Sequence, residues 1–564
     1  MNKSCFERFF IGISILASLF FTQVAYATTL EVGPGKTYTT IQDGIDAANP
    51  GDSIIVDPWT YYEQVIIDVP DVLLISSEFQ TTGITTKDTT LIDAGGGIGS
   101  IAVRVIANGV TIQGFTIHNY EYGIYVENCA AVIDNCLIYN TGVSCVYPPR
   151  GIQAYLAQLS NAFVTITHNK IYDNVLGGNW LSSGGRGINV YSDTAGTACE
   201  ILIDNNEVHG NDQRGISVFH IPATITDNYV HDNGIYYQNR YYNVGILLAY
   251  NKGTVLVQGN IIDGVIPGNI VYSGGIYLFA DKNYGYEPGY YGTINIDRNI
   301  IDTGSDASGI NINSPNIETF DIFITNNTIS GSTGELGGLY VWNMNPSYIG
   351  YVDIIEKNII KGNYIGIFVR RCDTGFLYHN DIYDNTSYGI YYHKKEIQGY
   401  LDATNNWWGD KTGPSGGVTD PVTGAIADGS GDSVSENIHF DPWLQEPFNE
   451  IEVNIDIKPG SYPNSINLGS KGNVPVAIFS TQDFDATTVD PTTVTLAGAS
   501  LKMKGRGAPM ASFEDVNVDG LLDMIVHVDT IFLELTETDT EAVLEGETFD
   551  GIRIRGVDAV RVIE

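Results

Sequence analysis

The sequence predicts an all-β protein: a parallel β-helix (solenoid) with a short N-terminal capping helix, followed by a small C-terminal β-sandwich-like domain. Two observations predict the solenoid. A Gly-Ile motif and an Asn motif alternate along the chain, and the shortest interval between successive Asn is 22 residues. A shift in composition after Pro447 predicts the second domain. The expected organisation is a leader over residues 1–27, the solenoid over 28–447 and the C-terminal module over 448–564.

The first residues are typical of a secretory signal peptide. Lys3 and Arg8 precede an apolar run over residues 9–21, and residues 25–27 (Ala-Tyr-Ala) form a small-x-small cleavage pattern. The run is too short for a comfortable membrane span. The sequence therefore predicts an exported protein, secreted, periplasmic or at the cell surface, with no membrane span.

The composition excludes several classes of protein. The 564 residues include 28 basic and 66 acidic side chains, for a net charge of −38. Such a chain is unsuited to nucleic acid, whose affinity for proteins comes largely from Lys and Arg on phosphates. A hydrophobic content of 43% excludes global disorder. Five cysteines follow the leader without a CxxC pair, which excludes a zinc framework and leaves room for one or two disulfides. We expect a monomer.

The two motifs alternate in strict order over ten units. The Gly that opens each Gly-Ile or Gly-Leu step is Gly123, Gly151, Gly187, Gly215, Gly245, Gly275, Gly309, Gly338, Gly366 or Gly389. The Asn that follows is Asn135, Asn169, Asn206, Asn228, Asn260, Asn299, Asn327, Asn358, Asn380 or Asn406. A period of about 22 residues that holds several short strands is typical of one coil of a parallel β-helix.

Each motif has a structural explanation in such a coil. Neighbouring coils lie about 4.8 Å apart, and the aliphatic side chains point into a shared core. The Asn residues are expected at bends, where they tolerate left-handed geometry and stack as amide ladders. The Gly residues allow bends that a Cβ would obstruct. We therefore predict that both sets are structural rather than catalytic.

Both ends of the solenoid carry capping signals. Ile41, Ile45 and Ala48 share one face of a predicted short helix, and residues 51–56 follow as a first strand. An Asn-Asn-Trp-Trp-Gly block at residues 405–409 follows the last coil. A solenoid needs such caps to cover its open ends.

With these caps and repeats, residues 29–445 or so resemble the right-handed parallel β-helix proteins with pectin-lyase-like folds and NosD-type repeats. The resemblance implies the right hand of the helix. It is weak for function, because this fold hosts lyases, glycosidases, esterases, epimerases and non-catalytic proteins. Motifs of specific enzymes, such as Gly-His-Gly or Asp-Pro-His-Glu, are missing from the sequence.

The C-terminal module resembles an accessory domain found at the ends of many exported bacterial proteins. Residues 474–479 and 524–528 are predicted strands. An acidic nine-residue loop precedes the second of them, and its predicted Ca²⁺ ligands are Asp515, Asn517, Asp519, Leu521 and Asp523. Oxygen ligands at positions 1, 3, 5 and 9, with Gly at position 6, suit Ca²⁺. The loop resembles those of FG-GAP and related β modules, and the ion would be structural. The alternative is a solvated acidic turn.

The residue before the Gly-Ile step is Arg150, Arg186 and Arg214 on three successive coils. Stacking in register would place these guanidinium groups about 5 Å apart, where like charges repel unless anions lie between them. Arg is well shaped to bind carboxylate or sulfate, and the long loops nearby carry aromatic side chains suited to sugar rings. The predicted aromatic contacts are Tyr147, Trp180 and Tyr237. The alternative is that the arginines pair with Asp193, Asp212 or Glu200.

A second column follows the Asn motif by three residues and contains Tyr172, His209, His231, Asp263 and Asp302. Alternation along the strands points these side chains outward. Two adjacent carboxylates push their pKa values apart, so one can serve as an acid and the other as a base. The His and Asp residues of this column are therefore the acid/base candidates. Adjacent His residues could instead bind a metal. Solvated surface positions are the plainer interpretation.

These features lead to three functional hypotheses. The first is a protein that binds an extracellular, anionic polysaccharide and, if catalytic, degrades it as a lyase or glycoside hydrolase. A lyase would abstract the proton α to a uronate carboxyl that Arg or Ca²⁺ neutralises. The second is a non-catalytic surface or adhesion solenoid, for which we expect no cleft and no close acid/base pair around the Arg column. The third is a NosD-like metal-delivery protein.

Overall fold

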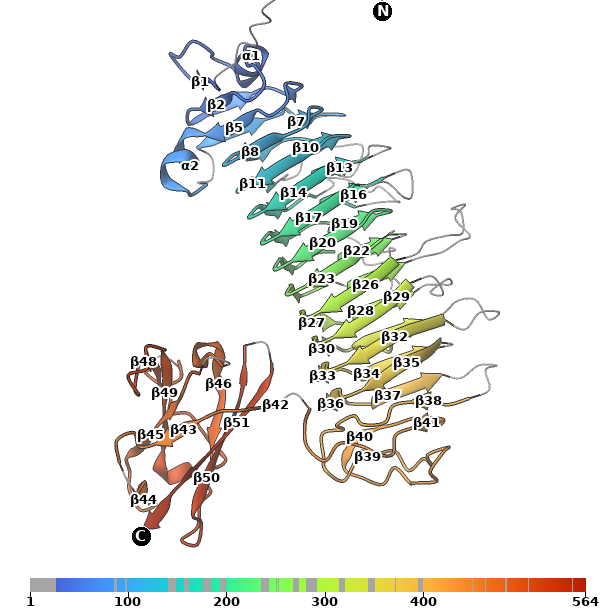
Figure 1. Ribbon diagram of the computed structural model, residues 1–564, viewed down its shortest axis with the longest axis vertical. Coiled ribbons are helices and arrows are strands. Elements are labelled where there is room, and N and C mark those ends of the chain that lie inside the picture. Colours follow the sequence, from blue (N-terminus) through green and yellow to red (C-terminus); the bar gives the residue numbers. More distant parts are fainter. Residues whose placement is uncertain are drawn as a thin grey trace, which may run out of the picture.

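The chain folds as a parallel β-helix followed by a β-sandwich (Figure 1). The computed structural model describes residues 27–85, 89–96, 99–139, 149–156, 162–175, 184–192, 199–234, 243–249, 251, 253–266, 273–279, 292–313, 320–342, 350–370, 372–393, 399–448, 450–461, 463–481, 484–505, 507–549 and 551–563. The predicted leader lies outside these residues. None of the helices in the described ranges is long and apolar enough to cross a membrane.

Within the described residues, three parallel sheets run the length of the solenoid, and each coil contributes one strand to each sheet. Sheet A has 13 strands: β1 (Thr29–Val32), β2 (Ser53–Val56), β5 (Leu73–Ser76), β8 (Val110–Gln113), β11 (Ala131–Asp134), β14 (Phe163–Thr167), β17 (Glu200–Asp204), β20 (Ala223–Thr226), β23 (Val255–Gln258), β26 (Gly292–Asp297), β29 (Phe320–Thr325), β32 (Gly350–Glu356) and β35 (Cys372–Tyr378).

Sheet B follows sheet A around the coil and has 12 strands: β3 (Trp59–Tyr62), β6 (Thr90–Asp93), β9 (Thr116–His118), β12 (Leu137–Tyr139), β15 (Lys170–Tyr172), β18 (Glu207–His209), β21 (Tyr229–His231), β24 (Ile261–Asp263), β27 (Ile300–Ser305), β30 (Thr328–Ser332), β33 (Ile359–Lys361) and β36 (Asp381–Tyr383).

Sheet C completes each coil, also with 12 strands: β4 (Val65–Ile67), β7 (Ile101–Val105), β10 (Tyr122–Glu127), β13 (Arg150–Tyr155), β16 (Arg186–Tyr191), β19 (Arg214–Phe219), β22 (Val244–Ala249), β25 (Gly274–Phe279), β28 (Ser308–Asn313), β31 (Leu339–Trp342), β34 (Ile365–Arg370) and β37 (Tyr388–His393). The all-β fold class predicted from the repeats is confirmed.

The Gly-Ile motif lies in sheet C and sets the approach of one coil to the next. Ile152 pairs with Ile188, and Ile188 with Ile216, and all three side chains are fully buried in one continuous core. A Cβ on Gly187 would lie 2.7 Å from the carbonyl oxygen of Gly215 and 2.4 Å from the Val208 side chain. The glycine is therefore required by close packing between coils rather than by an unusual backbone angle.

The Asn motif forms a buried amide ladder at the bend between sheets A and B. Its members are Asn169, Asn206, Asn228, Asn260, Asn299, Asn327, Asn358, Asn380 and Asn406. In each step the side-chain amide donates to the side-chain oxygen of the next Asn at 2.9–3.0 Å. That oxygen also accepts from a backbone N–H, so a polar column inside the core is satisfied.

Two details of the Asn columns differ from the sequence prediction. The strand pairing places Cys136, not Asn135, against Asn169, so the described ladder begins one coil later than the motif suggests. A second ladder runs five residues further on, at the bend between sheets B and C. There Asn174 donates to Asn211 at 2.8 Å, and Asn211 donates to Asn233 at 2.9 Å.

The caps close the two ends of the core. Helix α1 (Ile41–Asp46) begins after Thr40, whose side chain accepts from the Asp43 N–H, and it buries Ile41 and Ile45. A second helix, α2 (Ser77–Thr82), was not predicted and packs beside β5. At the other end, β38 (Leu401–Asp402) pairs with β41 (Ile438–His439), β39 (Pro414–Ser415) pairs with β40 (Gly431–Ser433), and Trp408 is fully buried.

The C-terminal module has its own hydrophobic core. One sheet contains β42 (Glu450–Glu452), β51 (Arg553–Ala559), β50 (Glu541–Thr548), β46 (Val489–Leu496) and β47 (Ala499–Ser500). The facing strands are β43 (Ile455–Ile457), β45 (Asn473–Ile478), β49 (Asp523–Asp529) and β48 (Ala511–Glu514), and β44 (Ser465–Asn467) pairs with β52 (Arg561–Ile563). The module contacts the last coils through Lys361, which pairs with Glu547, and through Arg553, which lies over the Tyr383 ring.

Cys129, Cys136 and Cys199 lie in the core. The thiol of Cys129 donates to the Val105 carbonyl, and that of Cys136 to the Asp134 carbonyl. Burial raises the pKa of Cys129 to about 11 and that of Cys136 to about 12. Both are therefore protonated, unreactive packing groups at neutral pH.

We predict that Asn228→Ala destabilises the solenoid by about 2–5 kcal/mol, because it orphans several buried groups at once. Asn228 donates to the carbonyls of Ile203 and Thr226 and to Asn260, and it accepts from Asn206. Thermal unfolding followed by circular dichroism measures the change. Thr224→Ala, on the same coil but only partly buried, is the control and should leave the Tm nearly unchanged.

We further predict a pH-dependent gain in stability for Asp432→Asn. Asp432, on β40 in the C-terminal cap, accepts from the side chain and N–H of Asn385. Burial raises the pKa of Asp432 to about 6, so its stabilising contribution is complete below about pH 4 and is lost as the pH rises through 6. The variant should unfold roughly 2–4 °C higher than wild type at pH 8 and show no gain at pH 4. Exposed Asp428→Asn serves as the control, and an equal gain at both pH values would contradict the prediction.

Candidate functional site

The structure brings the three predicted arginines together on sheet C. In the strand register Arg150 pairs with Arg186, and Arg186 with Arg214. They line one hollow of about 560 Å³ on the outer face of β10, β13, β16 and β19. The other lining residues are Tyr122, Tyr125, Gln153, Tyr155, Asn189, Tyr191 and Phe219.

Neutral amides hold Arg150 and Arg186 in place. Arg150 donates to the Gln153 side chain at 2.7 Å, and Arg186 donates to the Asn189 side chain at 2.7 Å. Asn189 in turn donates to Gln153 at 2.8 Å, which links the two coils. The amides orient the guanidinium groups but leave their positive charge uncompensated.

For Arg150 and Arg186, the predicted alternative of pairing with carboxylates receives no support from the described residues. Among these residues no ion pair is found for Arg150 or Arg186, and their Nε atoms are buried without a hydrogen-bond acceptor. Glu200 begins β17 on sheet A, and Asp212 accepts from the Gly185 N–H. Asp193 lies outside the described residues.

The pKa of Arg186 reflects the crowding of positive charge in the hollow. Burial, together with the neighbouring Arg214 and Arg150 guanidinium groups, lowers the pKa of Arg186 well below its usual value. Because an Arg side chain stays protonated at physiological pH, the shift measures how unfavourable its charge is in this position. An anion bound between the arginines would relieve that cost.

Aromatic side chains form the other wall of the hollow. Tyr155 stacks on Tyr191 with ring centroids 6.0 Å apart, and Tyr191 meets Phe219 edge-on at 6.1 Å. These rings were not predicted as site residues, although each stands five positions after the column of arginines on its strand. The predicted aromatics Tyr147, Trp180 and Tyr237 lie outside the described residues.

The His/Asp column forms as predicted, but on sheet B. Tyr172, His209, His231, Asp263 and Asp302 pair in register from β15 to β27. The rings of Tyr172 and His209 stack at 5.1 Å, and those of His209 and His231 at 4.6 Å. Burial, and the charges of Asp302 and Asp232, raise the pKa of Asp263.

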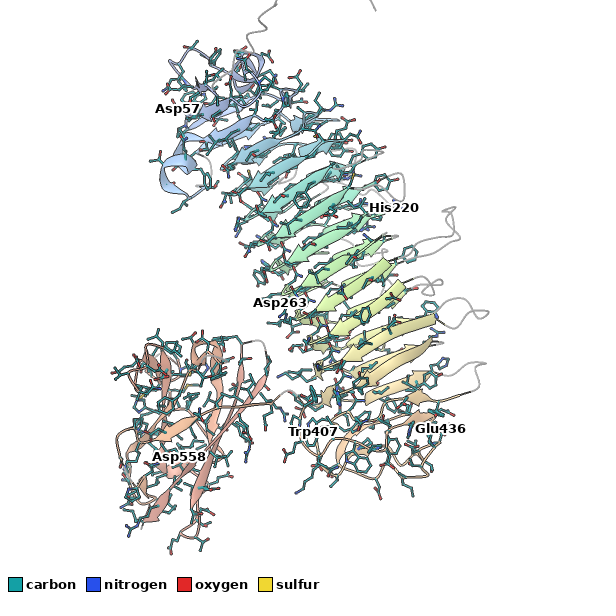
Figure 2. All side chains as sticks on the ribbon, in the orientation of Figure 1. Asp57, His220, Asp263, Trp407, Glu436 and Asp558 are labelled. Carbon is teal, nitrogen blue, oxygen red and sulfur yellow. The ribbon has the colours of Figure 1, made fainter. Side chains whose placement is uncertain are left out.

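The two columns do not form one site. None of the four acid/base candidates lines the hollow, whose described walls carry no His, Asp or Glu. Figure 2 shows Asp263 at one edge of the solenoid and His220, which follows β19, at the other. The arginines and the acid/base candidates therefore face solvent from different sheets.

Sequence reasoning missed Glu207, which joins the His residues on sheet B. Its Oε1 lies 3.5 Å from Nε2 of His209 and 3.6 Å from Nε2 of His231. Lys170 donates to the same oxygen at 2.7 Å. The signal was present in the sequence, because Glu207 follows a ladder Asn and precedes His209 by two residues on the same face of the strand.

The predicted calcium loop connects β48 to β49. Asp515 accepts from the N–H groups of Asp519 and Gly520, and Asp519 accepts from Leu521. Asp523 is fully buried, and its two oxygens accept from the N–H groups of Ser480 and Val516.

These contacts bear on the predicted calcium ligands. The carboxylates of Asp515, Asp519 and Asp523 are not gathered within 4.8 Å of one another as a three-ligand group. Asp523 anchors the loop to the sandwich, and calcium binding stays a prediction.

Residues 150–350 match the family model of the right-handed β-helix region. The solenoid has the fold of a right-handed parallel β-helix. This match covers the coils that carry both the Arg column and the His/Asp column. It confirms the predicted hand of the helix and does not by itself indicate an activity. No curated protein matches the chain.

Solved structures give distant likenesses. Pectin methylesterase PemA from Erwinia chrysanthemi is 11% identical with a TM-score of 0.26, and the match covers 53% of this chain and 87% of that one. The tailspike of E. coli bacteriophage HK620, in complex with a pentasaccharide, is 11% identical with a TM-score of 0.28, covering 94% and 92%. The tailspike of Acinetobacter phage vb_AbaP_AS12 is 9% identical with a TM-score of 0.27, covering 92% and 78%. Likeness at this level does not indicate a shared function.

If the acidic loop binds Ca²⁺, millimolar Ca²⁺ should raise the Tm of the C-terminal module, because the ion binds only the folded loop. Asp515→Ala should abolish this rise while it leaves the Tm without Ca²⁺ almost unchanged. Differential scanning calorimetry with Ca²⁺, Mg²⁺ or EDTA makes the measurement. A Tm that does not respond to Ca²⁺ would reject the prediction.

Proposed function

We propose that the protein binds an acidic polysaccharide outside the cytoplasm, in the hollow on sheet C. The observation that supports this most directly is the in-register stack of Arg150, Arg186 and Arg214. Two of these arginines have amide partners but no ion pair among the described residues. A ligand that carries regularly spaced anionic groups would complement the stack.

Each wall of the hollow suits part of such a ligand. Guanidinium groups bind carboxylate or sulfate through paired N–H donors. The faces of Tyr155, Tyr191 and Phe219 offer flat apolar surface of the kind that packs on sugar rings, and the phenol groups add polar tips. Gln153 and Asn189 add amide groups that can bind hydroxyls.

Charge selects among possible ligands. The protein carries a net charge of −38, so a polyanion is repelled at long range and held only where positive charge is concentrated. The hollow provides that concentration over three adjacent coils. The main alternative, a non-catalytic adhesion solenoid, predicts no cleft and no close acid/base pair around the Arg column. The hollow favours ligand binding over this alternative, whereas the described lining, which contains no His, Asp or Glu, agrees with a non-catalytic protein.

Export belongs to the same proposal. It rests on the signal-like pattern of residues 1–27, and it places the protein where acidic polysaccharides occur. Degradation of the polymer is the less supported part. Within the described residues, the acid/base candidates lie on sheet B, away from the lining of the hollow.

We predict that Arg186→Ala weakens binding to polygalacturonate by about 10- to 100-fold, the loss expected for one charge-assisted contact. Isothermal titration with oligomers of defined length measures the affinity. The unfolding curve should be unaffected or shifted upward, because removal of Arg186 relieves repulsion. Neutral dextran should not bind.

Arg104→Ala is the matched control, because Arg104 also lies on sheet C but is paired with Glu127. It should bind like wild type. Equal affinity of Arg186→Ala and wild type for every acidic polymer, or no binding by wild type across uronate and sulfate polymers, would reject the proposal. Absorbance of unsaturated product and reducing-end assays on the same mixtures report whether the bound polymer is also cleaved.

A further inference from the structure

Glu207, His209 and His231 converge on the outer face of sheet B, on two adjacent coils. One ligand atom from each lies within 4.8 Å of the others, and the Glu207 oxygen is 3.5 and 3.6 Å from the two imidazole Nε2 atoms. A tetrahedral Zn²⁺ site with bonds of about 2.0–2.1 Å has ligand atoms about 3.4 Å apart. Two of the three distances between ligand atoms, those from Glu207 to each imidazole nitrogen, are therefore already close to the distance in a zinc site.

Asp232 is placed to orient His231 as a metal ligand. Its carboxylate lies 2.9 Å from Nδ1 of His231, so a proton on Nδ1 would donate to Asp232 and leave Nε2 available to a metal ion. A carboxylate that fixes the far nitrogen of a His ligand is the usual outer partner in zinc sites.

Nε2 of His209 and Nε2 of His231 are both buried and make no close hydrogen bond, and the Glu207 carboxylate faces both at ion-pair distance. A cation bound between the two nitrogens and the carboxylate would satisfy all three groups.

The rings are held in position while solvent can still reach the site. Tyr172 stacks under His209, and the Tyr229 ring lies over His231 with centroids 4.1 Å apart. The Glu207 side chain is 36% exposed, so a fourth coordination position faces water. The imidazole rings are nearly parallel, at 12°, so metal binding requires each ring to turn out of the stack until its Nε2 lone pair points between the two coils.

We propose that Glu207, His209 and His231 bind a divalent transition-metal ion of the zinc class, with Asp232 positioning His231 and a water molecule completing the coordination. Two imidazoles and one carboxylate suit Zn²⁺, Cu²⁺ or Ni²⁺ rather than Ca²⁺, which takes oxygen ligands. Lys170 competes with the ion for the Glu207 oxygen. The site lies on sheet B and is independent of the polysaccharide hollow on sheet C.

The test is titration of the EDTA-treated, dialysed full-length protein with ZnCl₂, followed by calorimetry. We expect one saturable site that excess Ca²⁺ does not occupy. His209→Ala and His231→Ala should each weaken it more than about 100-fold, and Asp232→Asn by about 10- to 100-fold. Asn is suited to residue 232, because its backbone is left-handed with φ of 50°. Lys170→Gln should tighten binding several-fold, because it removes the competing ammonium.

His168→Ala is the matched control, since this exposed histidine also faces a carboxylate, that of Asp134, but has no second His beside it. It should leave zinc binding unchanged. Co²⁺ absorbance gives an independent readout, because a site with two His ligands produces visible bands that His231→Ala should remove. All variants replace outward-facing side chains, and unfolding curves confirm that they fold. Absence of saturable zinc binding, or binding that His209→Ala and His231→Ala leave unchanged, would overturn the proposal.

Discussion

The buried Asn ladder is the interaction on which the rest of the solenoid depends. Each ladder amide donates to the next coil and to backbone carbonyls, while its oxygen accepts from the coil before. Such a column is stable only when every member is in register, because a single slipped coil would leave several buried polar groups unpaired. The ladder therefore specifies one alignment of successive coils, where aliphatic packing alone would tolerate several.

That alignment turns sequence repeats into surface columns. Once Asn206 lies over Asn169, residues at equal distances from the ladder must also lie over one another. Arg186 is then forced to lie beside Arg150, although their charges repel. The core and the amide ladder outweigh this repulsion, because a solenoid of this length buries a continuous column of Ile and Val. The unfavourable charge remains on the surface, where an anionic ligand can neutralise it.

The solenoid presents different chemistry on different faces. Sheet C carries guanidinium groups and aromatic rings in one hollow, and sheet B carries imidazole and carboxylate groups in one outward column. The coil passes from one sheet to the other through a bend that contains the second Asn ladder. Buried amides hold this bend on the coils of Asn174, Asn211 and Asn233. The anion binding and the metal binding that we propose would therefore use side chains that the fold already places in columns.

The repeat pattern in the sequence was sufficient to predict the fold class, the sheet C register, the two columns and the capping helix. These features follow from periodicity, because residues that recur with the coil must stack. The first rung of the ladder was misplaced at Asn135, because the motif cannot distinguish the ladder position from its left-handed neighbour. The second ladder was overlooked because it lacks a following aliphatic motif.

Only the tertiary structure shows which side chains contact one another. Periodicity places His209 beside His231, but it does not show that Glu207 turns toward both rings or that the Asp232 carboxylate lies beside one of them. It likewise places three arginines in a column without showing that amides, rather than carboxylates, hold two of them. Stacking is dictated by backbone register, which a repeating sequence encodes. The direction of a side chain and the partner that it finds depend on rotamers and on neighbours from other coils, which no single repeat contains.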